Sequence, residues 1–172
     1  LHKRRQTISF RKVSERPVLS LNRGFSAPIT LAVEQKMEDR LFLARHDSDS
    51  FARWESLNAL YTDALIFATK AAKGGKKPKF QRELVDLAGE IAADEGLDAA
   101  YRALLLSLPA EADIAREIGS NIDPDAIHRA RHALRRRSQG RRLRLRPRRG
   151  RRPALAGGLP DILRRPSGRG TR

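Results

Sequence analysis

His128 and His132 have the spacing that most resembles a metal site in this 172-residue sequence. Histidines four residues apart share one face of a helix, as zinc-binding histidines do. The residues between them are Arg129, Ala130 and Arg131, so an arginine stands where a metallopeptidase helix carries its glutamate general base. The spacing is therefore present without the acid that zinc-dependent peptide hydrolysis requires.

The charge and orientation of this helix face also argue against a metal. Arg131 and Arg135 flank the two histidines and would repel a divalent cation. Helical angles place the histidines opposite Ile127 and Leu134, so we expect them to face solvent. We predict no catalytic, cofactor-binding or metal-binding residue in this chain.

Three acidic residues, Asp47, Asp49 and Glu55, form a second candidate cation site. They lack the spacing and the glycine of a calcium-binding loop. Aspartate just before an apolar helical pattern is typical of a helix N-cap, where its carboxylate accepts backbone N–H groups. We therefore expect the two aspartates to cap a helix.

Phe51, Trp54 and Tyr61 could provide a stacking platform for a ligand. Aromatic residues at helical spacing are more often core residues, and we expect these three to be core. A loop over residues 71–79 contains Lys73, Lys76, Lys77 and Lys79, which we expect to be solvated with weak attraction for polyanions.

The net charge of +16 is concentrated at the C-terminus. Residues 135–172 contain 15 arginines and one acid, a charge of +14, which leaves +2 for residues 1–134. Arginine, glycine and proline dominate this tail, which predicts disorder from residue 138. It would bind nucleic acid through phosphate contacts, adventitiously, and it has no aromatic residue for base stacking.

Hydrophobic periodicity predicts a mostly α fold preceded by a few strands. Alternation around Ile8 and Phe10, and again over residues 29–33, is typical of strands. From residue 37 the apolar spacing becomes helical, with six helices expected near 37–45, 51–70, 80–95, 98–108, 111–118 and 124–137. We expect three regions: 1–33, the end of a β-sandwich; 34–137, antiparallel helix pairs that begin an α-solenoid; and 138–172, the disordered tail.

Two stretches resemble the bacterial aminopeptidase N family. Residues 16–28 (Arg-Pro-Val-Leu-Ser-Leu-Asn-Arg-Gly-Phe-Ser-Ala-Pro) resemble the end of its β-sandwich domain. Residues 46–55 (His-Asp-Ser-Asp-Ser-Phe-Ala-Arg-Trp-Glu) resemble the opening of its helical C-terminal domain. Residues 106–109 and 122–127 fit the same family, and the resemblance covers roughly residues 6–137 and ends at Arg137.

The resemblance implies a zinc metallopeptidase that releases N-terminal amino acids from peptides. The family's zinc-binding His-Glu-x-x-His helix, its Gly-x-Met-x-Asn loop and its catalytic tyrosine precede the matched region, and neither motif occurs here. We therefore expect zinc, peptide substrates and the catalytic domain to lie outside this chain, which supplies helical scaffold and is inactive by itself.

Composition bounds the remaining alternatives. The chain has no cysteine and no apolar run long enough to cross a bilayer, and we expect a cytoplasmic protein. The change of composition after Arg137 predicts an out-of-frame reading of a GC-rich gene. The alternative function is a small basic protein that binds RNA or DNA through its arginine-rich tail.

Overall fold

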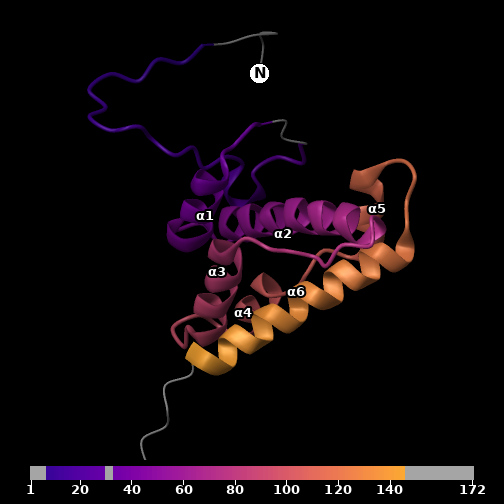
Figure 1. Cartoon of the computed structure of the whole chain (residues 1–172). Helices are drawn as coiled ribbons and strands as arrows, with labels where there is room; N and C mark the ends of the chain where they lie inside the picture. Colours follow the sequence, from indigo (N-terminus) through magenta and orange to yellow (C-terminus); the bar gives the residue numbers. More distant parts are fainter. Residues whose placement is uncertain (1–6, 30–32, 146–172) are drawn as a thin grey trace, which may run out of the picture.

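A computed structural model describes residues 7–29 and 33–145, and the side chains of these residues up to 140. Six α-helices follow a single 3-10 turn, η1 (Arg23–Phe25). They are α1 (Met37–His46), α2 (Ser50–Lys73), α3 (Arg82–Ala93), α4 (Ala99–Leu105), α5 (Glu111–Ile118) and α6 (Pro124–Leu145). The six predicted helices are present, with ends shifted by a few residues, and the mostly helical fold is confirmed (Figure 1).

The strands predicted in region 1–33 are not formed in the part that the structure describes. Residues 7–29 and 33–36 contain no strand, and residues 30–32 lie outside the described ranges. Ile8 and Phe10, expected to alternate on a strand, are 68% and 77% exposed. A strand needs a neighbour to pair its N–H and C=O groups, and two short segments cannot form a stable sheet.

Aspartate side chains cap the starts of several helices. The carboxylate of Asp98 accepts the N–H groups of Ala100 and Tyr101, both at 2.9 Å, at the start of α4. Asp123 accepts the N–H of Ala126 at 2.9 Å, one turn into α6. These bonds satisfy N–H groups that have no partner within the helix.

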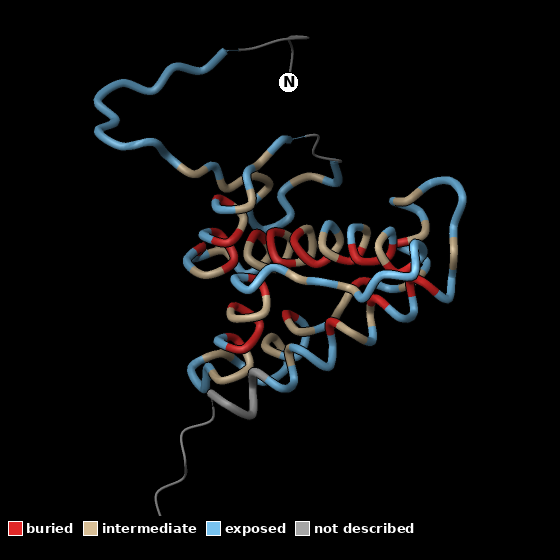
Figure 2. The backbone as a smooth tube through the Cα atoms, in the orientation of Figure 1, coloured by how far each residue is buried: buried red, intermediate tan, exposed pale blue. Residues whose placement is uncertain are grey.

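One apolar core joins α2, α3 and α6. Helix α2 packs against α1 on one side and α6 on the other, and α3 packs against α6. Figure 2 shows the buried positions along the facing sides of these helices. The largest side chains with less than 2% exposure are Tyr61, Leu57, Leu65, Leu84, Leu87, Leu105, Ile114, Ile127 and Leu134.

Helix α6 continues past the expected boundary at residue 137. It ends at Leu145, so residues 138–145 are helical where the sequence predicted a disordered tail. Arginine, leucine and glutamine have good helix propensity, and this stretch has one glycine and no proline. Residues 146–172, most of the predicted tail, lie outside the described residues. No helix within the described ranges is both long and apolar enough to cross a membrane.

Candidate functional site

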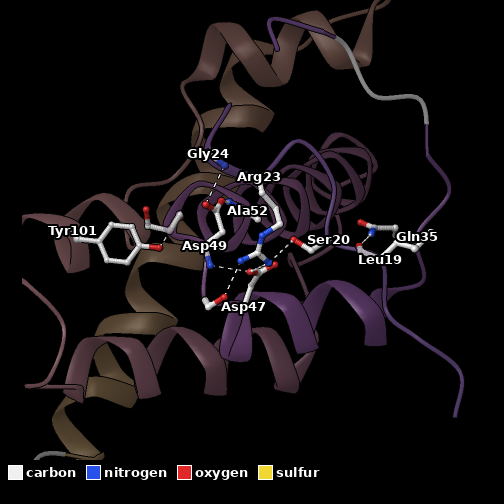
Figure 3. A network of polar contacts seen from close by, with 11 residues as sticks. Leu19, Ser20, Arg23, Gly24, Gln35, Asp47, Asp49, Ala52 and Tyr101 are labelled. Carbon is white, nitrogen blue, oxygen red and sulfur yellow. Dashed lines mark hydrogen bonds and ion pairs between the residues drawn. The ribbon is translucent and has the colours of Figure 1, made fainter. Parts of the chain in front are cut away.

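The predicted capping aspartates lie where the N-terminal segment, residues 7–36, meets the helical body, residues 37–145. Asp49 is the N-cap of α2, and its Oδ1 accepts the N–H of Ala52 at 2.8 Å. Its Oδ2 accepts the N–H of Gly24 at 3.0 Å. The predicted cap is confirmed for Asp49, whose carboxylate also binds the N-terminal segment (Figure 3). The prediction is wrong for Asp47, which follows the end of α1 and accepts the N–H of Asp49 rather than one from α2.

Asp47 is the buried centre of this junction, with a side chain only 1% exposed. Its Oδ1 accepts a hydrogen bond from Arg23 Nη1 at 2.7 Å and another from the Asp49 N–H at 2.8 Å. Arg23 Nη2 donates to Ser48 Oγ at 2.8 Å (Figure 3). A buried carboxylate needs such a charge partner, so Arg23 compensates for the burial of Asp47.

The backbone of η1 is shaped to reach this junction. Gly24 has φ +64°, the left-handed region that glycine adopts without penalty. Phe25 has φ +51°, which is uncommon for a residue with a bulky side chain. Its ring lies 5.2 Å from that of Phe51, centroid to centroid. The ring contact and the Gly24 N–H bond hold this turn against the start of α2.

The pKa of Asp49 lies below its ordinary value of 3.8. The largest cause is the hydrogen bond from the Ala52 N–H, followed by that from Gly24, and the positive charge of Arg23 acts in the same direction. A carboxylate stabilised in this way is a poor proton acceptor. The junction is therefore built for attachment rather than for acid–base chemistry.

Further contacts attach the N-terminal segment at other points. Arg16 forms a two-pronged ion pair with Asp39 of α1, with Nη1 3.2 Å from Oδ1. Within the segment, Gln35 Nε2 donates to the carbonyl of Leu19 at 2.8 Å. On the opposite side of Asp49, the Tyr101 hydroxyl donates to the Ser50 carbonyl at 2.7 Å (Figure 3). Burial raises the pKa of Tyr101, so this hydroxyl keeps its proton.

Glu55 does not join Asp47 and Asp49. It is half-buried and lines a separate cavity of about 120 Å³ together with Arg40 and Ser56. Burial raises the pKa of Glu55. Among the residues that the structure describes, no three His, Asp or Glu side chains are grouped so as to hold a metal ion.

The predicted aromatic residues divide between core and junction. Tyr61 is 1% exposed and belongs to the core. Trp54 is half-buried and packs against that core, and its ring lies 5.9 Å from that of Phe51. Phe51 faces the N-terminal segment through Phe25. The core prediction holds for Tyr61 and in part for Trp54, and it is wrong for Phe51, which is not part of the core cluster.

His128 and His132 face solvent, as predicted from the helical angle. Their rings stack with centroids 6.4 Å apart, and the side chain of His128 is 70% exposed. His128 Nδ1 lies 3.1 Å from Glu111 Oε1, which Arg131 Nη1 also contacts at 3.2 Å. These bonds, that of His128 first, lower the pKa of Glu111. The residues do not fit zinc, since the carboxylate beside the histidines is shared with a guanidinium.

The lysine loop is exposed, as expected. Lys76, Lys77 and Lys79 lie at the surface, and Lys73, also exposed, donates from Nζ to the carbonyl of Asn121 at 2.9 Å. That bond ties the end of α2 to the turn before α6. Lys79 also lines a hollow of about 350 Å³ together with Phe67 and Phe80.

Sequence reasoning missed Arg23 and Gly24 as junction residues. Both fall inside residues 16–28, the stretch that carried the family resemblance, so the pattern was seen without its physical role. The available signal was the aspartate pair after α1. Two carboxylates so close together need donors from elsewhere in the chain.

Comparisons with known proteins agree with this two-part organisation. Residues 37–144 match the family described as domain of unknown function DUF3458_C, ARM repeats. Residues 1–34 match the related DUF3458 domain, described as an Ig-like fold. The boundary between the two matches falls just before α1, next to the junction described above.

Individual relatives are aminopeptidases. The chain is 37% identical to aminopeptidase N of Caulobacter vibrioides over 135 residues, which is 78% of this chain and 15% of that protein. It is 31% identical to aminopeptidase N of Escherichia coli over 75% of this chain and 15% of the relative. The chain thus spans about 15% of the length of the curated relatives it matches.

The fold also has a counterpart among solved structures. The structure of Legionella pneumophila aminopeptidase A in complex with aspartic acid matches with a TM-score of 0.60 and 24% identity, over 77% of this chain and 15% of that chain. At this identity the likeness shows a shared fold. The domain matches and the sequence relatives show that the chain belongs to the aminopeptidase N family, where it matches parts of the Ig-like and ARM-repeat domains.

Proposed function

We propose that this chain is part of a cytoplasmic, zinc-dependent aminopeptidase N that releases N-terminal amino acids from peptides, and that it supplies scaffold rather than chemistry. The observation that carries the proposal is the junction itself. Arg23, from the stretch that matches the Ig-like domain, pairs with the buried Asp47 in the stretch that matches ARM repeats. The pair fixes the two stretches to each other.

In this proposal the helical body begins an α-solenoid that caps the active-site chamber. Zinc, the peptide-binding groups and the catalytic residues belong to a catalytic domain outside the described residues. Rigidity at the junction would matter because a cap positions a substrate only if its own orientation is fixed. No catalytic step is assigned to a residue of this chain.

A graft tests the proposal. Residues 7–145 would replace the matching stretch of the Caulobacter vibrioides relative, and hydrolysis of aminoacyl-p-nitroanilides and zinc content would be measured. We expect the graft to be active and zinc-loaded, and the 172-residue chain alone to be inactive. Arg23→Ala in the graft should lower kcat at unchanged zinc content, whereas Arg11→Ala, at an exposed arginine of the same segment, should not.

Two results would contradict the proposal. The first is peptidase activity of the isolated chain with one zinc per molecule. The second is a folded, zinc-loaded graft without activity.

The charge of the C-terminal residues favours one alternative, a basic protein that binds RNA or DNA. Fifteen arginines lie between residues 135 and 172, and such a cluster binds phosphates in a salt-dependent way. Strong preference for one RNA sequence at 0.15 M salt would support this alternative. Weak binding that is independent of sequence would be adventitious.

A further inference from the structure

A second cavity, unrelated to the junction, lies inside the helical body. It has a volume of about 290 Å³ and opens between α2, α3, α6 and the linker after α4. Small-molecule pockets in proteins usually span about 300 to 1,000 Å³, so this one suits a small ligand. Its lining residues are Tyr61, Ala88, Ala92, Leu106, Ser107, Leu108, Arg135, Ser138 and Gln139.

The cavity contains a polar group without a partner in the described structure. Ser138 Oγ is buried and forms no hydrogen bond. Tyr61 is 1% exposed and lines the same cavity. Burial raises the pKa of Tyr61 well above its ordinary value, so the hydroxyl remains a neutral donor. A buried donor such as the Ser138 hydroxyl is normally paired, which points to a ligand with acceptor atoms.

Arg135 supplies positive charge at the mouth of the same cavity. Its side chain is exposed, and it forms no ion pair within residues 7–29 and 33–145. A guanidinium binds carboxylates through two parallel N–H bonds. Gln139, also exposed and one helical turn further along α6, adds an amide donor at the rim.

The remaining wall is apolar apart from Ser107, whose hydroxyl donates to the Ala103 carbonyl, and it contains no acid. The rest of the cavity is lined by the apolar side chains of Ala88, Ala92, Leu106 and Leu108. A ligand with an ammonium group would meet Arg135 and find no carboxylate among the lining residues. This wall therefore favours an apolar body and disfavours a free amino group.

We propose that this cavity binds a small carboxylate with an apolar body and no ammonium group beside the carboxylate. The carboxylate accepts hydrogen bonds from Arg135, the body lies against the alanines and leucines, and the Tyr61 and Ser138 hydroxyls donate to acceptors within the cavity. An N-acylated apolar amino acid and the C-terminal residue of a peptide share this chemistry.

Isothermal titration calorimetry of the 172-residue chain with N-acetylphenylalanine tests the site. We expect measurable binding, weaker by about tenfold with N-acetylphenylalaninamide, because a charge-assisted bond is lost. Phenylalanine should also bind more weakly, because its ammonium group has no partner. Acetyl-Ala-Ala-Phe separates the two sources: binding as tight as that of N-acetylphenylalanine identifies a peptide C-terminus, and loss of binding identifies a free N-acyl amino acid.

Variants locate the site. Arg135→Gln should weaken N-acetylphenylalanine binding by about tenfold, and Ala92→Phe should abolish it by filling the cavity. The matched control is Arg136→Gln, the neighbouring exposed arginine, which does not line this cavity. Circular dichroism and Tm show that each variant is folded.

The proposal is overturned if N-acetylphenylalanine and its amide bind equally, or if no binding is detected at millimolar concentration. It is also overturned if Arg136→Gln weakens binding as much as Arg135→Gln, since the effect would then be one of general charge. These outcomes leave the scaffold proposal untouched, because the graft experiment measures a different property.

Discussion

The helical body and the N-terminal segment contain similar apolar residues, but the body buries them and the segment leaves most of them exposed. In the body, leucines and isoleucines from α2, α3 and α6 form one buried core. In the segment, most large apolar side chains are exposed, and attachment comes from the ion pairs Arg23–Asp47 and Arg16–Asp39. The exposed apolar residues there are Ile8, Phe10, Val13, Leu19, Phe25, Ile29 and Val33.

The difference shows that a segment with an apolar pattern forms its secondary structure only when another element is close enough to pack against it or pair with it. A helix satisfies its own backbone and needs one neighbour for its apolar stripe, which α2 and α6 provide for each other. An alternating strand pattern needs other strands beside it and a sheet or helix against its face. We therefore expect the body to be stable by itself and the segment to depend on a few polar anchors.

Truncation of a core leucine should have the largest effect. Leu84 is 0% exposed, and Leu84→Ala should lower the free energy of unfolding by about 2 to 5 kcal/mol, because burial is lost and a cavity remains. The matched change in the segment, Ile8→Ala, should alter it by less than about 0.5 kcal/mol. Urea unfolding followed by circular dichroism measures both. Equal effects would remove the distinction between the regions.

The junction ion pair should have an intermediate effect. Removing Arg23 leaves the buried Asp47 carboxylate without its charge partner, so Arg23→Ala should cost about 1 to 3 kcal/mol of segment attachment. A double-mutant cycle with Asp47→Asn isolates the coupling between the two side chains. Attachment is measured from the rate of limited proteolysis within residues 7–29. No coupling in the cycle would mean that the pair does not hold the segment.

Acid should loosen the junction before it unfolds the body. The pKa of Asp49 in the folded chain lies below 3.8, chiefly through the Ala52 N–H bond. A depressed folded-state pKa means that the stabilisation is complete above the unfolded value and is lost as pH falls through the folded one. The Gly24 amide proton, which Asp49 accepts, should therefore shift with a midpoint below pH 3.8 in NMR spectra. Asp49→Asn should abolish that transition, and a midpoint above 3.8 would contradict the assignment.

The histidine pair should have the smallest effect on stability. His128 is exposed, and its contacts with Glu111 and His132 lie at the surface, so His128→Ala should change the free energy of unfolding by about 0.5 kcal/mol or less. Neither the parent chain nor His128→Ala should retain zinc after dialysis. One zinc per chain that disappears in the variant would show that this face binds metal.

Much of the helical body was predictable because helix patterns are local. The apolar stripes and the caps Asp49, Asp98 and Asp123 lie within a few residues of the structures they specify. The exposure of Ile8 and Phe10 was not predictable in this way, since strand formation depends on chain segments far away in the sequence. The end of α6 was misjudged because arginine, which dominates composition there, also has good helix propensity.

The junction and the cavity could not be predicted, for a different reason. Arg23 and Asp47 are 24 residues apart in sequence, and no periodicity links them. Tyr61 and Ser138 come together only because α2 packs against α6. Long-range pairs of this kind require the packed fold.

Amide hydrogen exchange on the full chain tests the central claim, that a self-sufficient helical body carries a segment attached at a few polar points. The account predicts slow exchange in α2, α3 and α6, intermediate protection at Gly24, and fast exchange over residues 7–15. Asp47→Asn should accelerate exchange at Gly24 while leaving α3 and α6 unchanged. Uniform slow exchange across residues 7–29, or loss of protection in α3 and α6 on the same substitution, would contradict it.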